Sequence, residues 1–214
     1  MKKELEGLLG ELEDIYSTSD IYQACLDKGY NYGYGLISTC LKPGRPLFLG
    51  FNWGAGSGTD FSSQQTVEPE PFLEQELGSF SRIVPYCRQY FSETDIAEAS
   101  QSNFCFFRSE SEKDISQHDI QLCLPIFDKL INIIQPSIVL GFSGKLRNHL
   151  TSQNLVQDLS TKEITFKRGK SNITYLTQKG FLQGGTKICF LPHPNYPMQK
   201  QAREQAWEFC FHPG

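Results

Sequence analysis

Three polar side chains stand beside apolar runs of the sequence, and their types could do chemistry together. Asn52 follows the first of four such runs, Asn103 opens the second, and His193 follows the fourth. A side-chain amide presents a hydrogen-bond donor and an acceptor together, and a neutral imidazole also has one of each. If the chain brings these groups to one place, they could bind the polar edge of a flat ligand and stabilise charge on it.

Asn52 also opens a loop that is unusually rich in glycine, with Gly54, Gly56 and Gly58 close behind it. One interpretation is a plain turn, because glycine, serine and threonine suit turns. The other is a binding loop, in which backbone N–H groups without side chains around them approach a ligand closely. Taken alone, an asparagine at a strand end is usually a cap or a turn former, so the rest of the chain must decide.

The elements that would position these groups are those of a three-layer αβα domain. Four short apolar runs are typical of strands buried on both faces, and they predict a central, mostly parallel four-stranded sheet: residues 46–51, 102–107, 137–141 and 187–191. Helices are expected over residues 2–16, 20–27, 120–134, 144–150 and 197–211, and a hairpin over 162–178. Ligands of such sheets bind beyond the carboxyl ends of the strands, where Asn52 and His193 are expected.

Composition narrows the class of protein. The 214 residues predict a single domain, 1–214, that begins with a helical extension over 1–45. No apolar run reaches the ~20 residues that cross a bilayer, and the first residues lack the apolar core of a signal peptide. Seven cysteines without a Cys-x-x-Cys pair are interpreted as reduced core residues. We therefore expect a cytoplasmic, intracellular protein (nuclear if its source is eukaryotic) without membrane contact, cofactor or metal.

The net charge of −4 is unusual for a protein that binds nucleic acid, although it leaves room for a local basic patch. Against that background, several motifs resemble the uracil-DNA glycosylase superfamily, most closely its mismatch-specific (thymine/uracil) and single-strand-selective branches. Gly-Phe-Asn-Trp-Gly at 50–54 resembles the Gly-x-Asn-Pro-Gly motif, and 55–61 resembles the small-residue run before the base-stacking aromatic. Asn103-Phe-Cys resembles the central asparagine motif, and His193-Pro-Asn-Tyr-Pro resembles the His-Pro-Ser motif.

The resemblance covers about residues 46–210, including 133–143, which is similar to the helix end and strand before the final motif. It departs from the family at Trp53, where proline is usual, and at Asn195, where serine is usual. It implies a DNA N-glycosylase of base excision repair that removes uracil or a related damaged base. Such a base must be flipped out of a duplex or be single-stranded already, so the expected partner is DNA, bound by a monomer.

The resemblance also implies roles for individual residues. Asn52 would hold the attacking water and His193 would donate a hydrogen bond to a base carbonyl, which makes these two the catalytic pair. The residues expected to bind the base are Asn103, Phe61, Gly50 and Phe51, with Phe80 as the second candidate for stacking. Those expected to contact DNA are Gly54, Gly56, Ser143, Lys145, Asn195, Tyr196 and Met198. Further phosphate contacts could come from Arg147, Lys200 and Arg203, unless these only solvate helix faces.

Two other functions remain open at this stage. The first is a catalytically inactive protein of the same fold that binds nucleic acid or a nucleobase-like ligand, which the two departures and the acidic balance favour. The second is a hydrolase that uses Ser143 in Gly-Phe-Ser-Gly, although this string lacks the Gly-x-Ser-x-Gly spacing of a nucleophile elbow.

Overall fold

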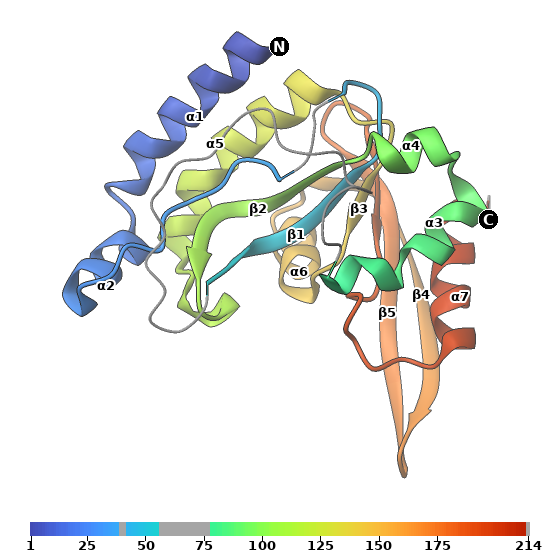
Figure 1. Cartoon of the computed structure of the whole chain (residues 1–214). Coiled ribbons are helices and arrows are strands. Elements are labelled where there is room, and N and C mark those ends of the chain that lie inside the picture. Colours follow the sequence, from blue (N-terminus) through green and yellow to red (C-terminus); the bar gives the residue numbers. More distant parts are fainter. Residues whose placement is uncertain (39–41, 56–77, 213–214) are drawn as a thin grey trace.

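The computed structural model describes residues 1–38, 42–55 and 78–212, and the predicted site residues Gly56 and Phe61 lie outside these ranges. The fold is α/β, with one mixed sheet of six strands between two layers of helices (Figure 1). No helix in the described ranges is long and apolar enough to cross a membrane.

The sheet contains the four predicted strands and two more. Its strands are β1 (Leu47–Gly54), β2 (Ser100–Ser109), β3 (Val139–Gly141), β4 (Val156–Arg168), β5 (Ser171–Leu182) and β6 (Lys187–Phe190), in the spatial order β2-β1-β3-β6-β5-β4. Strands β2, β1, β3 and β6 are parallel, whereas β5 and β4 are added antiparallel. The prediction of a four-stranded sheet was therefore wrong. The hairpin was recognised from its alternation, whereas the pairing of β5 with β6 across the next short turn was not predicted.

Two layers of helices cover the sheet. One face carries α1 (Lys2–Tyr16), α2 (Asp20–Lys28), α5 (Gln117–Ile134) and α6 (Gly144–Ser152), and the other carries α3 (Val84–Tyr90), α4 (Glu93–Ala97) and α7 (Lys200–Phe211). Helices α3 and α4 were not predicted, because they are too short for a helical period to stand out. Helix α7 begins three residues later than expected from Pro197, which instead belongs to the loop before it.

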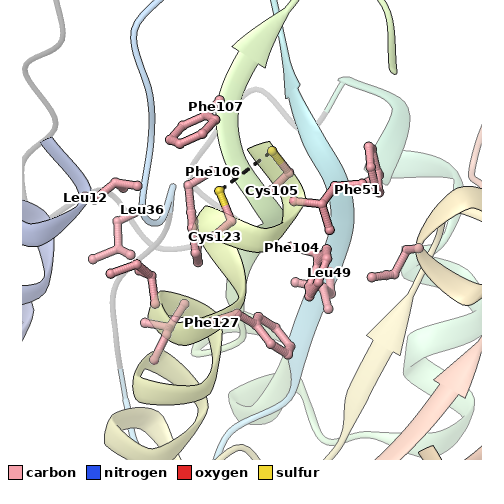
Figure 2. Close-up of a cluster of buried hydrophobic side chains, with 14 of the residues drawn as sticks. Leu12, Leu36, Leu49, Phe51, Phe104, Cys105, Phe106, Phe107, Cys123 and Phe127 are labelled. Carbon is pink, nitrogen blue, oxygen red and sulfur yellow. Dashed lines mark hydrogen bonds between the residues drawn. The ribbon is translucent and has the colours of Figure 1, made fainter. Parts of the chain in front are cut away.

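The core on the α5 side joins the N-terminal helices to the sheet. Figure 2 shows Leu12 of α1 in the same buried cluster as Phe104 of β2 and Phe127 of α5. The Sγ atoms of Cys105 and Cys123 lie 3.8 Å apart in this cluster without a disulfide. All six described cysteines are free and buried, as predicted, and Cys40 lies outside the described residues. Helices α1 and α2 are thus part of the main core.

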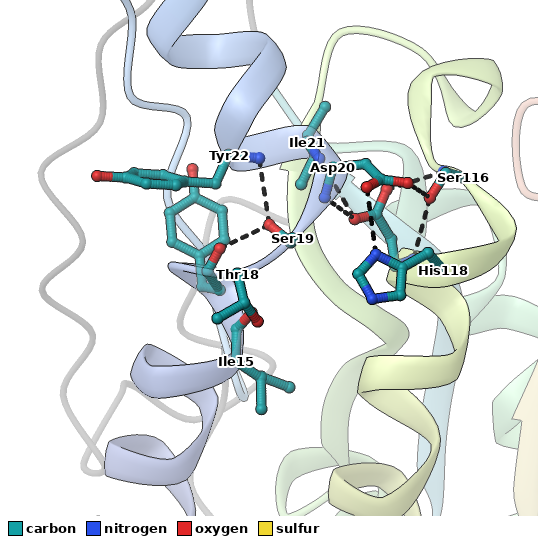
Figure 3. Close-up of polar contacts among 10 residues, drawn as sticks. Ile15, Thr18, Ser19, Asp20, Ile21, Tyr22, Ser116 and His118 are labelled. Atoms are coloured by element: carbon teal, nitrogen blue, oxygen red, sulfur yellow. Dashed lines mark hydrogen bonds and ion pairs between the residues drawn. The ribbon is translucent and has the colours of Figure 1, made fainter.

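A polar junction fixes α2 against the start of α5 (Figure 3). The buried carboxylate of Asp119 accepts hydrogen bonds from the backbone N–H groups of Asp20 at 2.9 Å, Ile21 at 3.3 Å and Ser116 at 2.9 Å. Asp20 in turn accepts a hydrogen bond from Ser116 Oγ, and this bond, with a second contact to His118, lowers the pKa of Asp20. One side chain therefore satisfies orphan donors at two helix N-termini.

The outer edge of β2 is covered by the segment between α2 and β1. Tyr34 forms an antiparallel bridge with Phe107, and the N–H of Gly35 donates to the carbonyl of Phe106 at 2.8 Å. The N–H of Ser38 donates to the carbonyl of Gln101 at 3.0 Å. The segment between α2 and β1 is therefore a structural cover of this edge.

Candidate functional site

The site begins with two neighbouring residues of β1 and β2. Gly50 pairs with Asn103 in the parallel register, and the amide of Asn103 lies across Gly50. A β-carbon added to Gly50 would stand 2.1 Å from Asn103 Oδ1, so only glycine leaves room for this side chain. Asn103 is 7% exposed, and its amide forms no hydrogen bond with the described part of the chain. Its polar atoms are not among the enclosed atoms that lack a partner, so they are open to the site and could bind a polar ligand there.

Asn52 lies two residues beyond Gly50 on the same face of β1. Its Nδ2 donates to the carbonyl oxygen of Trp53 at 2.9 Å and to Ser109 Oγ at 2.7 Å. The hydroxyl of Ser109 itself donates to the carbonyl of Ser111, so it must accept from Asn52. These bonds fix the orientation of the amide and leave Oδ1 as the atom that can accept a hydrogen bond from a water molecule.

His193 is exposed on the loop between β6 and α7, three residues after the last residue of β6. Its Nδ1 accepts a hydrogen bond from the backbone N–H of Asn195 at 3.1 Å, so the proton of the neutral ring is on Nε2. Partial desolvation lowers the pKa of His193, with the charge of Arg203 acting in the same direction and that of Glu112 opposing them. At neutral pH this residue is a neutral imidazole that can donate from Nε2.

Arg203 of α7 is hydrogen-bonded to the loop that carries His193. Its guanidinium donates to the carbonyl oxygens of Pro192, His193, Pro194 and Tyr196 at distances of 2.7 to 3.5 Å. The side chain is 7% exposed, and this burial lowers its pKa. The sequence suggested a phosphate contact by Arg203, but its guanidinium N–H groups are bonded to carbonyl oxygens of the loop. We therefore describe it as a positioning residue for His193.

A carboxylate that was not predicted from the sequence lies beside Ser143 at the start of α6. Glu112 follows β2, and its Oε1 accepts a hydrogen bond from Ser143 Oγ at 3.3 Å. Its charge also acts to raise the pKa of His193. Ser143 also caps α6, since its Oγ accepts from the N–H groups of Lys145 and Leu146. The polar run after the second predicted strand was the signal that could have revealed Glu112.

The basic residues near this edge contact the protein itself. Lys145 Nζ donates to the carbonyls of Glu112 and Ile115 and lies 4.5 Å from the ring centroid of Phe51. Arg147 donates to the carbonyl of Leu176 at 2.5 Å, and exposed Lys200 lies 3.8 Å from Glu204. A phosphate contact by any of these side chains would have to replace or share the present partner.

The aromatic candidates have different surroundings. The side chain of Phe51 is 2% exposed and belongs to the core (Figure 2), so only its backbone could meet a ligand. Phe80 is half-buried on the opposite face of the sheet, edge-to-face with Phe142 at 5.9 Å. Since Gly50, Asn52 and Phe48 alternate onto that face, Phe80 stands on the side of the sheet that carries the amides.

The remaining residues predicted to contact DNA include the end of β1 and the loop after His193. Gly54 and Asn195 are exposed, whereas Met198 is half-buried against the core on the α7 side. The ring of Tyr196 packs against Tyr175 at 5.5 Å and cannot wedge into DNA without leaving that partner.

Trp53, at the position where the resembling family has proline, is anchored by the N-terminal cover of β2. Its indole N–H donates to the carbonyl of Gly35, and the guanidinium of Arg108 lies 5.7 Å from its ring centroid. A hydrogen bond to a fixed segment thus restricts this end of β1 in place of the proline ring.

The structure therefore forms two groups on neighbouring strands, toward the carboxyl edge of the sheet. Gly50, Asn52 and Asn103 form the amide group, whereas His193, Glu112 and Ser143 form the histidine group. No hydrogen bond among the described residues joins them. A cavity of about 280 Å³ between α5 and α6 contains none of these residues and lies at the opposite, amino edge, beside the β5–β6 turn.

No protein-family model matches the sequence, and no curated protein matches it either.

Proposed function

We propose that this protein is a DNA glycosylase that hydrolyses the N-glycosidic bond of uracil or a related damaged base. The observation that carries the proposal is the buried amide of Asn103, which lies across Gly50 with no partner in the described chain. An amide offers a donor and an acceptor side by side, which is the complement of a pyrimidine edge. The resemblance in the order of the motifs supports the same conclusion.

The chemistry follows from the orientation of the two catalytic groups. Breaking the bond from the sugar to the base leaves a cation-like sugar and an anionic base. His193 donates from Nε2 to a base carbonyl and stabilises that anion as it forms, because its Nδ1 is already occupied by the Asn195 N–H. Asn52 holds the attacking water through Oδ1, and Glu112 is the nearby carboxylate that can take up the released proton.

The test is base excision from uracil-containing oligonucleotides, single-stranded and as duplexes with a U·G or U·A pair, read as strand cleavage after alkali. We expect His193→Ala and Asn52→Ala to lower the single-turnover rate by about 100- to 1000-fold. Asn103→Ala should reduce both binding and rate. Matched controls are His118→Ala and Asn132→Ala, which change exposed residues of α5 and should retain the wild-type rate.

A second candidate function is a non-catalytic protein that binds nucleic acid or a nucleobase-like ligand at the same site. Trp53 and Asn195, which replace the usual proline and serine of the resembling motifs, favour it. An intact strand at stoichiometric protein, with binding that depends on Asn103, would support this candidate. If the folded protein neither cleaves nor binds any of these DNAs, both candidates fail.

A further inference from the structure

The β4–β5 hairpin extends past the carboxyl edge of the parallel strands. Phe190, the last residue of β6, pairs with Gln178, so the part of β5 that precedes Gln178 continues beyond β6. Figure 1 shows this part projecting from the body of the molecule, with the segment that leads into α7 beside it. Residues 162–177, here called the arm, stay paired up to Arg168 and Ser171. The arm is thus an ordered two-stranded extension at the edge that holds the candidate site.

The arm is strongly basic in a protein of net charge −4. It contains Lys162, Lys167, Arg168 and Lys170 and one acidic residue, Glu163. All four basic side chains are exposed, and none is in an ion pair with an acidic side chain of the described chain. Three of them surround the turn at Gly169, which has a φ of +61°. Unpaired cations concentrated on a protruding turn of an acidic protein indicate an anionic partner.

The arm is also fixed to the loop that carries His193. Tyr196 packs on Tyr175 of β5 at 5.5 Å and on Phe166 of β4 at 6.3 Å. Gln199 Nε2 donates to the carbonyl of Lys167 at 3.2 Å, close to the turn. The same short loop therefore contacts the arm at Tyr175 and again close to its turn at Lys167. These contacts hold the basic turn in a defined direction from His193.

We infer that the arm binds the phosphate backbone of DNA that flanks the nucleotide held at the candidate site. This inference rests on the proposed function. From Thr177 beside the end of β6 to Lys170 the strand advances seven residues, or about 23 Å at the usual rise of a β-strand. That length corresponds to about seven nucleotides of B-form DNA. The lysines and arginine of the turn would thus meet phosphates well outside the base pocket.

The experiment measures DNA binding without chemistry. Fluorescently labelled 24-base-pair duplexes with a central, uncleavable abasic analogue are titrated from 50 to 300 mM salt. The test variant is Lys167→Gln/Arg168→Gln/Lys170→Gln, and its control is Lys3→Gln/Lys28→Gln/Lys129→Gln, which removes equal charge from the α1, α2 and α5 layer. Circular dichroism and thermal unfolding check that both variants fold.

We expect the arm variant to bind about 10- to 100-fold more weakly at 100 mM salt, with a slope of log K against log salt that is about 2 to 3 smaller in magnitude. The control variant should bind as wild type does. Shortening the duplex to two base pairs on one side of the abasic analogue should abolish the difference between wild type and arm variant. Shortening the other side should not.

The outcomes separate this inference from the proposed function. If wild type excises uracil and the arm variant binds with unchanged affinity and slope, the inference is wrong and the proposed function stands. If wild type binds no DNA, both are wrong. Arm-dependent binding of a polyglutamate peptide, with DNA binding that does not depend on the arm, would assign the arm to an acidic protein partner instead and would overturn the inference.

Discussion

The candidate site requires glycine at position 50, because a side chain there would collide with Asn103. Substitution by alanine would bring a methyl group to 2.1 Å from Asn103 Oδ1, so the Asn103 amide must move. We expect Gly50→Ala to destabilise the protein by about 1 to 3 kcal/mol, as overpacking does, and to impair ligand binding. Urea denaturation measures the first effect and titration with DNA the second.

Two further variants make this prediction specific. Removing the displaced group in Gly50→Ala/Asn103→Ala should restore most of the lost stability but not the binding. Gly7→Ala on α1, where nothing lies within 4 Å of the added atom, should instead stabilise by about 0.5 to 1 kcal/mol. Equal stability of Gly50→Ala and wild type would show that Asn103 does not lie across Gly50 in solution.

His193 gives a prediction about pH. Desolvation lowers its pKa, so the folded protein binds this proton less readily than the unfolded chain does. Its contribution to stability is complete above the ordinary histidine pKa of about 6.5 and is lost as the pH falls through the lowered folded value. Titration by NMR should give a midpoint below that of an unfolded histidine. Because the charge of Glu112 opposes the shift, Glu112→Gln should lower the midpoint further.

The control for this titration is Glu6→Gln on α1, which should leave the midpoint where it is in wild type. A midpoint that rises in Glu112→Gln, or does not move, would mean that the carboxylate does not act on the imidazole.

At the level of individual residues, the sequence predicted part of the site. Asn52 and His193 were expected at the carboxyl edge because each follows a buried run. Asn52 lies near the carboxyl end of β1, and His193 lies three residues after the end of β6. Asn103 opens its apolar run, yet β2 starts three residues before it and places the amide beside Gly50. The roles of Glu112 and Arg203 could not be predicted, because both depend on contacts between segments distant in the chain.

At the scale of elements, the junction of α2 and α5 gives a test of how the N-terminal helices are held. Asp119→Ala would leave three backbone N–H groups without the carboxylate that accepts from them. We expect a loss of about 3 kcal/mol in the free energy of unfolding, since buried unsatisfied donors are costly. Asp119→Asn, which keeps one oxygen, should lose less, and exposed Asp14→Ala should change stability by less than about 0.5 kcal/mol.

Urea denaturation followed by circular dichroism measures these differences. If Asp119→Ala is as stable as Asp14→Ala, α2 does not depend on this carboxylate.

Element boundaries were predictable wherever a period or a cap was clear. The first helix was expected over 2–16 and is found at Lys2–Tyr16, and α5 accommodates Pro125 inside an otherwise regular apolar period. The hairpin was underestimated, because outward-facing polar residues of β4 and β5 continue past the short stretch of alternation. Strand β5 pairs with β6 across a short turn, from Phe181 to Lys187, and Gly184-Gly185 in that turn was the local signal that could have predicted the pairing.

At the scale of the whole molecule, the buried thiols report on the integrity of the core. Six of the seven cysteines are free and buried, and burial raises the pKa of Cys87 to about 12. Since the thiolate is the reactive form, we expect native protein to react with a thiol reagent at no more than one site, Cys40. Native Cys40→Ser should not react, whereas all seven thiols of the wild type should react in guanidinium chloride. Rapid labelling of a second thiol in native protein would contradict this packing.

The two borders of the sheet differ in a way that limits how copies of the chain can meet. Backbone groups of β2 are bonded by the stretch that contains Tyr34 and Gly35, whereas β4 pairs with no further strand among the described residues. Among the described strands, β4 is therefore the one that a strand from another molecule could join. If two copies paired through β4, the outer strand at each end of the joined sheet would be β2, whose edge is already hydrogen-bonded. The sheet could then not be extended into a fibre.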